Sequence, residues 1–215
     1  MELHKLDSFG VLYHKFSDDD IAFLCDRISE IQQDFESAPN AEGRLVGHLH
    51  EQRGFREDTE MMDKIQDLVA PLLNLYNQQY PGYLAKYQIL SDDRPLYLSD
   101  AWVNFMKKYE YNPAHNHSGL FSFVMWTQIP YTREDEASLS TVPSKAIKEN
   151  KVTNGCFEIF YTNTLGSLDS SRLPLDKSYE GGILFFPSQF YHTVYPFYTS
   201  DDYRISVSGN FHLKV

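Results

Sequence analysis

The fold is decided by a stretch near the C-terminus, residues 181–212, which reads GGILFFPSQFYHTVYPFYTSDDYRISVSGNFH. A short apolar strand ends at Pro187, the chain turns, and His192 begins another strand. In the last strand polar residues alternate with apolar ones, and the polar set is Arg204, Ser206, Ser208 and Asn210. Because successive side chains point to opposite faces, this strand has one polar and one apolar face. If the polar face lines an interior, the Arg204 guanidinium needs an anion, and its planar fork suits a carboxylate.

Outward from this stretch, the second half of the chain contains further apolar, aromatic-rich segments separated by Gly, Pro, Asn, Asp and Ser clusters. They predict strands at residues 97–108, 120–129, 156–161, 183–186, 193–198 and 203–215. Short strands at this spacing indicate an antiparallel sandwich or barrel, without crossover helices. Two long polar segments, residues 131–155 and 163–182, are expected to be lids or binding loops, and the first is the expected specificity element.

The first half of the chain predicts two helices. Ser17 is the expected cap of the first helix, and apolar residues then recur at spacings of three and four as far as about Ser37. The second helix is expected from about Thr59 to just before Pro81, with a kink or break at Pro71. Both helices should pack on one outer face of the sandwich.

The expected organisation is therefore mainly β with a helical extension. Residues 1–96 would supply helical support and leading strands, and residues 97–215 would form the β core, within one structural domain overall.

Composition excludes several classes of function. The chain has 215 residues, of which 42% are hydrophobic, so one well-packed domain is expected. Its net charge of −11, without a Lys/Arg-rich run, argues against a nucleic-acid partner. No apolar run approaches the roughly 18 residues of a membrane span, and the first residues lack the pattern of a signal peptide. The two cysteines, Cys25 and Cys156, lie outside any CxxC motif and predict buried thiols in a reducing cytoplasm; the oligomeric state stays open.

The sharpest local motif is His115-Asn116-His117. In an extended strand, residues two apart face the same way, so these two imidazoles should point into one space. That arrangement suits two adjacent ligands of a transition metal. Taken alone, the motif is also compatible with a pair of hydrogen-bonded histidines on a strand edge.

Taken in order, these features resemble the iron(II)- and 2-oxoglutarate-dependent oxygenase superfamily over residues 97–212. The nearest resemblance is to a small uncharacterised group from phages and marine bacteria, and a phage origin would place the protein in the host cytoplasm. The matching elements are Trp102-Val103-Asn104, His115-Asn116-His117, Phe186-Pro187-Ser188, His192 and Arg204-Ile205-Ser206. The resemblance implies a double-stranded β-helix, which is a jelly roll, with iron held inside it.

One position departs from the usual pattern of the superfamily, which is His-x-Asp or His-x-Glu with a distal His. Here His117 stands where the carboxylate would be, so the resemblance implies three histidine ligands, His115, His117 and His192. Alternatively, His117 orients another ligand and a nearby acid such as Glu158 supplies the oxygen ligand. A site that keeps the fold without turnover is a further alternative.

The resemblance also implies the reaction, in which Fe(II), 2-oxoglutarate and O2 yield succinate, carbon dioxide and a hydroxylated C–H bond. Arg204 and Ser206 would bind the distal carboxylate of 2-oxoglutarate, and Asn104 is a further candidate contact. The substrate is unidentified: a peptide or protein side chain, as in prolyl hydroxylases, is the first expectation and a small metabolite the second. Candidate residues of its pocket, which could equally be core, are Trp102, Trp126, Tyr131 and Tyr191.

Two other functions are compatible with parts of the pattern. A three-histidine cupin-type dioxygenase would use no 2-oxoglutarate, and such a site has no need of the Arg-x-Ser of the last strand. A non-catalytic jelly roll with a binding or structural role would need neither the three histidines nor the arginine.

Overall fold

The computed structural model describes residues 8–41, 47, 49–87, 96–139, 141–148 and 151–214. Its helices are α1 (Asp18–Gln33), α2 (Thr59–Gln79), α3 (Gly82–Ala85), α4 (Arg133–Ser138) and α5 (Ser144–Lys148), with short 3-10 turns η1 (Phe35–Ser37) and η3 (Lys177–Tyr179). Its strands are β1 (Leu12–Lys15), β2 (Glu51–Gly54), β3 (Leu96–Met106), β4 (Asn112–His115), β5 (Phe121–Gln128), β6 (Phe157–Thr162), β7 (Leu168–Leu173), β8 (Gly182–Pro187), β9 (Tyr191–Val194) and β10 (Arg204–Leu213).

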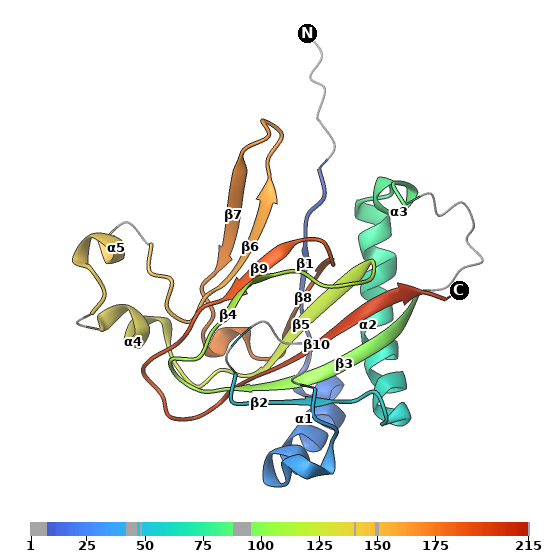
Figure 1. The fold of residues 1–215 in the computed structure, drawn as a ribbon, viewed down its shortest axis with the longest axis horizontal. Helices are drawn as coiled ribbons and strands as arrows, with labels where there is room; N and C mark the ends of the chain where they lie inside the picture. The colour runs from blue at the N-terminus through green and yellow to red at the C-terminus, as the bar shows by residue number, and fades with distance from the viewer. Residues whose placement is uncertain are drawn as a thin grey trace.

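Two antiparallel sheets form the β core (Figure 1). The larger sheet has the strand order β1-β8-β5-β10-β3-β2, and the smaller has the order β4-β9-β6-β7. Phe157 and Ile159 of β6 belong to one buried cluster with Val124 and Trp126 of β5, so the inner faces of the two sheets meet. This arrangement confirms the predicted antiparallel sandwich.

Helices α1 and α2 cover the outer face of the larger sheet, as expected (Figure 1). Helix α1 begins with a capping box, in which the Ser17 hydroxyl accepts from the Asp20 backbone N–H and the Asp20 carboxylate accepts from that of Ser17. The buried residues of α1 follow the predicted helical spacing, and they are Ile21, Leu24, Ile28 and Ile31. They join the apolar outer side of the sheet in one hydrophobic cluster.

The alternation along β10 separates two environments. Ile205, Val207 and Phe211 are buried in the cluster between the larger sheet and the helices. The side chains between them face the smaller sheet and line a cavity, and they are Arg204, Ser206, Ser208 and Asn210. Strands β3, β5 and β8 alternate in the same way, so the larger sheet has an apolar outer face and a partly polar inner face.

Four strands have no counterpart among the predicted ranges, namely β1, β2, β4 and β7, although leading strands without bounds were expected within residues 1–96. Strands β1 and β2 have four residues each and pair with β8 and β3, at the two edges of the larger sheet. Short edge strands carry too few buried side chains to show a clear alternation, and their backbone pairing defines them.

The helix boundaries differ from the expectation at two points. Helix α1 ends at Gln33 and not at Ser37, because Asp34 is extended and its carboxylate accepts from the Glu36 N–H to start a separate turn. Helix α2 passes through Pro71 without interruption, and Pro71 lies on its exposed side. Burial of the residues that follow, among them Leu72 and Tyr76, favours continuation of the helix over a break.

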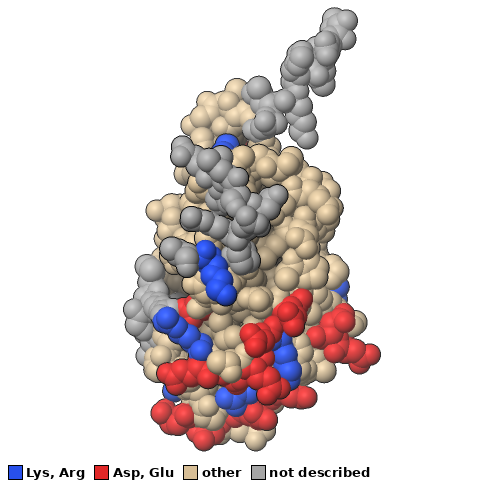
Figure 2. Space-filling view, turned by 90° about the vertical axis from the view of Figure 1, so that its right-hand side faces the viewer, with Lys and Arg blue, Asp and Glu red and all other residues tan. Residues whose placement is uncertain are grey.

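Acidic side chains are numerous on one face of the molecule, where the helices lie. Figure 2 shows Asp and Glu concentrated on the lower part of one face, at the height of α1 and the first turns of α2. Within the described ranges, no helix is both long and apolar enough to cross a membrane.

The outer cluster predicts a large stability effect for Phe185→Ala. Phe185 is fully buried and its ring packs against Tyr76, Phe121 and Phe211. The cavity left by its loss should lower the free energy of unfolding by about 3–5 kcal/mol in urea denaturation. The matched control is Leu168→Ala on β7, where the side chain is 78% exposed and the change should stay within about 0.5 kcal/mol. Equal effects of the two substitutions would contradict this packing.

Candidate active site

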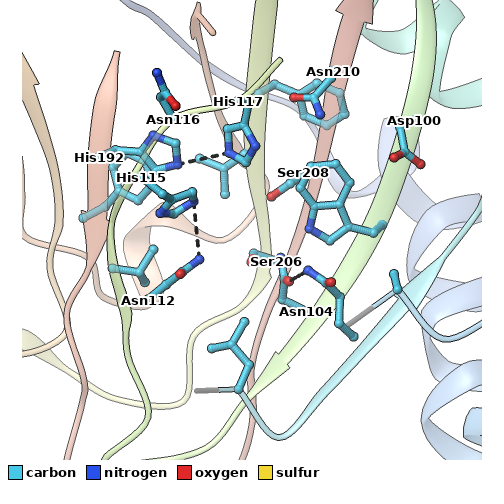
Figure 3. Close-up of a pocket in the computed structure, with 18 of the residues that line it drawn as sticks. Asp100, Asn104, Asn112, His115, Asn116, His117, His192, Ser206, Ser208 and Asn210 are labelled. Carbon is cyan, nitrogen blue, oxygen red and sulfur yellow. Dashed lines mark hydrogen bonds between the residues drawn. The ribbon is translucent and has the colours of Figure 1, made fainter. Parts of the chain in front are cut away.

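Three histidines meet on one wall of the inner cavity, between its two ends (Figure 3). His115 ends β4, His117 follows it in the next turn, and His192 lies on β9. The register of the smaller sheet pairs His115 with His192. The Nε2 atoms of His117 and His192 lie 3.3 Å apart, and one ring nitrogen from each histidine lies within 4.8 Å of the others.

Backbone carbonyls fix the orientation of two of these rings. The Nδ1 atom of His115 lies 2.7 Å from the carbonyl oxygen of Pro113, and that of His192 lies 3.2 Å from the carbonyl oxygen of Phe190. Because a carbonyl oxygen only accepts, Nδ1 carries the proton in both rings and Nε2 keeps its lone pair. This support of the non-ligating nitrogen is the usual arrangement around metal-binding histidines.

Burial keeps the three imidazoles neutral. Burial lowers the pKa of His117 to about 4, with a further contribution from nearby His115. Burial also lowers the pKa of His115 and, strongly, that of His192. The His192 ring stacks on Phe157 and meets the edge of Phe186. Near neutral pH all three rings are therefore in the form that binds metals.

The cluster fits a divalent transition metal. With metal–nitrogen bonds of about 2.1 Å, two ligands at right angles lie about 3 Å apart, close to the observed separation of the His117 and His192 nitrogens. The imidazoles are neutral and of the ligand type that iron and similar metals accept. Among the described residues, these three histidines are the group that could hold a metal ion.

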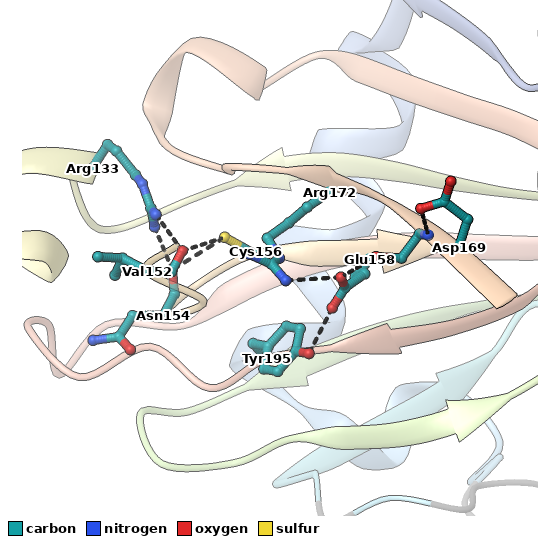
Figure 4. Close-up of polar contacts among 9 residues, drawn as sticks. Arg133, Val152, Asn154, Cys156, Glu158, Asp169, Arg172 and Tyr195 are labelled. Carbon is teal, nitrogen blue, oxygen red and sulfur yellow. Dashed lines mark hydrogen bonds and ion pairs between the residues drawn. The ribbon is translucent and has the colours of Figure 1, made fainter. Parts of the chain in front are cut away.

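Glu158, the alternative oxygen donor, lies outside this cluster (Figure 4). Its side chain is buried, with Oε1 accepting from Ser170 Oγ at 2.7 Å and from the Arg172 guanidinium at 2.8 Å. Its Oε2 accepts from the Tyr195 hydroxyl at 2.6 Å. These hydrogen bonds and the ion pair lower the pKa of Glu158 against the opposing effect of burial. Both carboxylate oxygens thus have partners away from the histidines.

The cavity in front of the histidines has a volume of about 490 Å³. The register of β10 and β3 arranges its floor in rows, which are Arg204 with Met106, Ser206 with Asn104, Ser208 with Trp102, and Asn210 with Asp100. Successive rows are two residues, or about 6.7 Å, apart along the strand. The ring of His117 lies beside that of Trp102, so His117 stands at the third row.

Arg204 lies in the first row, at the inner end of the cavity, and is only 2% exposed. Its guanidinium donates to the Tyr131 hydroxyl at 2.8 Å and to the carbonyl oxygens of Gly155 and Tyr195 at 3.2 and 3.0 Å. It also contacts the sulfur of Met106, which is a weak acceptor. All of these partners are neutral. Among the described residues, no carboxylate balances this buried charge.

The other expected cosubstrate residues occupy the second row. Ser206 and Asn104 face each other, with 3.4 Å between the Asn104 amide and Ser206 Oγ. The Gln52 amide lies 2.7 Å from that of Asn104 and, with its oxygen turned toward the indole, accepts from Trp102 Nε1 at 2.8 Å. These polar groups line the cavity between Arg204 and the histidines.

The four aromatic candidates for a substrate pocket are not brought together. Trp102 lines the cavity beside His117, whereas Trp126 lies in the second row and packs against Phe157. Tyr131 lies behind Arg204, where its hydroxyl accepts from the guanidinium and donates to the Gly155 carbonyl. Tyr191 is half exposed and lies outside the cavity lining.

The described part of the segment that follows Tyr131 packs against the rest of the fold. Helix α4 presents the buried Glu136, which accepts from the backbone N–H groups of Tyr198 and Thr199. Gly155 has a positive φ of 67°, and a Cβ there would lie 2.6 Å from the Tyr131 ring, so only glycine fits. Tyr131 and Gly155, at the two ends of the segment, thereby hold the Arg204 guanidinium from behind.

Several residues of the site escaped the sequence analysis. Phe157 and Phe186 pack on His192, and Ser122 and Ser188 share a buried hydrogen bond of 2.8 Å beneath the histidines. The Phe186-Pro187-Ser188 motif signalled both Phe186 and Ser188. No pattern in the sequence distinguishes the others from ordinary core residues.

Comparison with known proteins bears on the family. The family model for 2OG-Fe(II) oxygenases matches residues 100–210, which is more than half of the chain. No curated protein matches the sequence significantly.

Solved structures of similar fold cover nearly the whole chain. A prolyl-4-hydroxylase from Pseudomonas putida has a TM-score of 0.53 and 12% identity, covering 97% of this chain and 95% of its own. The viral collagen prolyl hydroxylase of Paramecium Bursaria Chlorella virus-1, in its 2OG complex, has a TM-score of 0.52 and 14% identity, with coverages of 95% and 96%. A non-heme alpha-ketoglutarate-dependent epimerase from nogalamycin biosynthesis has a TM-score of 0.54 and 11% identity, with coverages of 95% and 76%.

At these identities the similarity establishes the fold, which is the double-stranded β-helix. The expected jelly roll with helices on its outer face is confirmed, while the narrower resemblance to a phage and marine-bacterial group stays a prediction. The match over residues 100–210 contains the three histidines, Arg204 and Ser206. The chain therefore belongs to the 2OG-Fe(II) oxygenase family, which uses Fe(II), 2-oxoglutarate and O2.

Proposed function

We propose that this protein is an iron(II)- and 2-oxoglutarate-dependent hydroxylase whose metal ligands are His115, His117 and His192. One observation carries the proposal. Three neutral, converging imidazoles face a cavity, and the inner end of this cavity holds a buried arginine without a carboxylate partner among the described residues. When bound, iron(II) supplies the reaction of O2 with 2-oxoglutarate and the transfer of one oxygen atom to a C–H bond.

Arg204 is the proposed anchor of the distal carboxylate of 2-oxoglutarate. The carboxylate would replace the weak Met106 sulfur contact and supply the missing negative charge. Ser206 and Asn104, one row nearer to the histidines, can donate hydrogen bonds along the molecule.

Apolar side chains between Arg204 and the histidines exclude water from this part of the cavity. Trp126, Phe157 and Phe186 are each at most 1% exposed and line the cavity on the way to His192. A dry environment strengthens the pairing of Arg204 with a carboxylate.

For the substrate we propose a C–H bond of a peptide or protein side chain, with a free small metabolite as the second choice. Two of the similar structures are prolyl hydroxylases, which supports this order although the similarity concerns the fold. Within the cavity, Trp102 is the aromatic residue placed beside His117 to contact such a group.

The test is an anaerobic titration of the protein with iron(II), with and without 2-oxoglutarate. Metal binding with a visible absorption band that depends on 2-oxoglutarate supports the proposal. Metal binding without that band would indicate a cupin-type dioxygenase, and no metal binding would leave a non-catalytic jelly roll.

In the same titration, His192→Ala should abolish detectable iron binding while the circular dichroism spectrum stays native. The substitution removes the most deeply buried of the three imidazoles. The control is His14→Ala on β1, an exposed histidine outside the cavity, which should bind iron as the unaltered protein does. Unchanged iron affinity in His192→Ala would remove this residue from the ligand set.

Replacing Arg204 should weaken 2-oxoglutarate binding while iron binding persists. Loss of a charge-assisted hydrogen bond predicts a dissociation constant raised by roughly 10- to 100-fold in Arg204→Ala. Arg204→Lys should recover only part of the affinity, because an ammonium group cannot form the planar fork. Since Arg204 also ties Tyr131 to Gly155, the lysine variant serves as the better-folded comparison. An unchanged dissociation constant in both variants would exclude Arg204 from the cosubstrate site.

The lowered histidine pKa values predict that the metal-free protein loses stability in mild acid. Between pH 6.5 and about 4, the unfolded chain binds protons at these histidines while the folded chain does not. The free energy of unfolding should therefore fall as the pH drops through this window, with about 2–3 kcal/mol coming from His117. Urea denaturation at several pH values measures this loss, and His117→Asn should flatten the curve. A curve with the same slope in that variant would contradict the assignment.

A further inference from the structure

The cavity changes character where it passes the histidines. Toward Arg204 its walls are mixed: Met106, Trp126, Phe157 and Val194 are apolar, whereas Gln52, Asn104 and Ser206 are polar. Beyond Trp102 and His117 the lining is mainly polar, and it includes Ser99, Asp100, Asn116, Ser118, Asn210 and His212. The proposed function leaves this outer half without an assigned ligand.

Asn210 is a buried, hydrogen-bonded side chain of the outer half (Figure 3). It is 7% exposed, and its Oδ1 accepts from Ser122 Oγ at 2.8 Å. Ser122 Oγ in turn lies 2.8 Å from Ser188 Oγ, and both hydroxyls are buried. Because Oδ1 is engaged, the amide nitrogen of Asn210 is the atom left for the cavity. No described residue accepts a hydrogen bond from it.

The same pair of serines ties Asn210 to the histidine cluster. The backbone carbonyl of Ser188 accepts from the backbone N–H of His117 at 3.0 Å. Ser188 thus connects the two: its hydroxyl reaches Asn210 through Ser122, and its backbone carbonyl holds the His117 N–H. The amide donors consequently have a set position relative to the proposed metal ligands.

Across the β10–β3 pair, Asn210 lies directly opposite Asp100. Side chains in such a pair lie on the same face, with Cβ atoms about 5 Å apart. One offers N–H donors and the other carboxylate acceptors, and a carboxylate has room for several donors at once. In an extended peptide, the N–H and C=O of one residue point to the same side. The Asn210–Asp100 pair is complementary to that edge of a peptide.

We propose that the outer half of the cavity is the substrate subsite, and that Asn210 determines specificity by donating to a main-chain carbonyl oxygen of an extended peptide. The inference rests on the proposed function, because it places the peptide beside the histidines. The row of Ser208 and Trp102 is about 6.7 Å from Asn210 along the strand, so a side chain of the held peptide would reach His117.

The test uses N-acetylglycine N-methylamide, which carries one residue's N–H and C=O, with the protein loaded with manganese(II) and 2-oxoglutarate. Proton relaxation of the probe's methyl groups by manganese(II) reports binding close to the metal. In Asn210→Asp the donors are lost, but Ser122 can still donate to a carboxylate oxygen, so the fold should hold. Its dissociation constant for the probe should rise about 3- to 10-fold.

Ser122→Ala removes the hydrogen bond that holds the Asn210 amide, and it should raise the dissociation constant for the probe by a smaller factor. The control is Asn163→Asp in the β6–β7 turn, which adds the same charge and still caps the backbone N–H groups of Leu165 and Ser167. This variant should bind the probe as the unaltered protein does.

Equal binding by Asn210→Asp and the unaltered protein would overturn the inference, as would preferential relaxation of methyl β-D-glucopyranoside, which would indicate a carbohydrate subsite. Failure of the proposed function has a different signature. In that case the unaltered protein would show no 2-oxoglutarate-dependent band with iron(II), whatever the probe does.

Discussion

The pairing of β10 with both β3 and β5 is the constraint on which the rest of the structure depends. It places β10 in the middle of the larger sheet, where one face must be apolar to pack on the helices. The other face is then free to carry the polar row from Arg204 to Asn210. The helical layer and the smaller sheet are both positioned by this one strand, since each covers one of its faces.

The sequence predicts those parts of the fold and site that show as side-chain periodicity or as a compact motif. The alternation along β10 and the helical spacing in α1 reflect which side chains are buried, so the sequence predicts both directly. His115, His117 and His192 also converge, because an H-x-H motif and a strand-borne histidine need only one strand pairing to meet. Contacts made by backbone geometry or long-range packing could not be predicted. The pairing of β1 with β8 and of β2 with β3 depends on residues far away in the sequence, and so do the hydrogen bonds of Glu158.

Residues 131–155 include polar side chains that bind backbone groups inside the fold. Its charge and length predict a lid, a binding loop or a mobile segment, whereas its two ends, Tyr131 and Gly155, support Arg204 from behind. The buried Glu136 binds backbone N–H groups near Thr199, and Arg133 donates to the carbonyl of Asn154. These side chains are polar because they satisfy buried backbone groups, which sequence patterns do not distinguish from exposure to water.

The irregularities in the pairing of β10 carry a consequence for how this chain can change over evolutionary time. Register shifts occur between Ile205 and Ser206 against β5, and between Asn210 and Phe211 against β3. They bracket residues 206–210, which face the cavity together with Arg204. A one-residue insertion or deletion within that segment would turn every later side chain of the strand to the opposite face. Length variation should therefore be tolerated at the two shifts and in the loops, whereas residues 206–210 can diverge only by substitution.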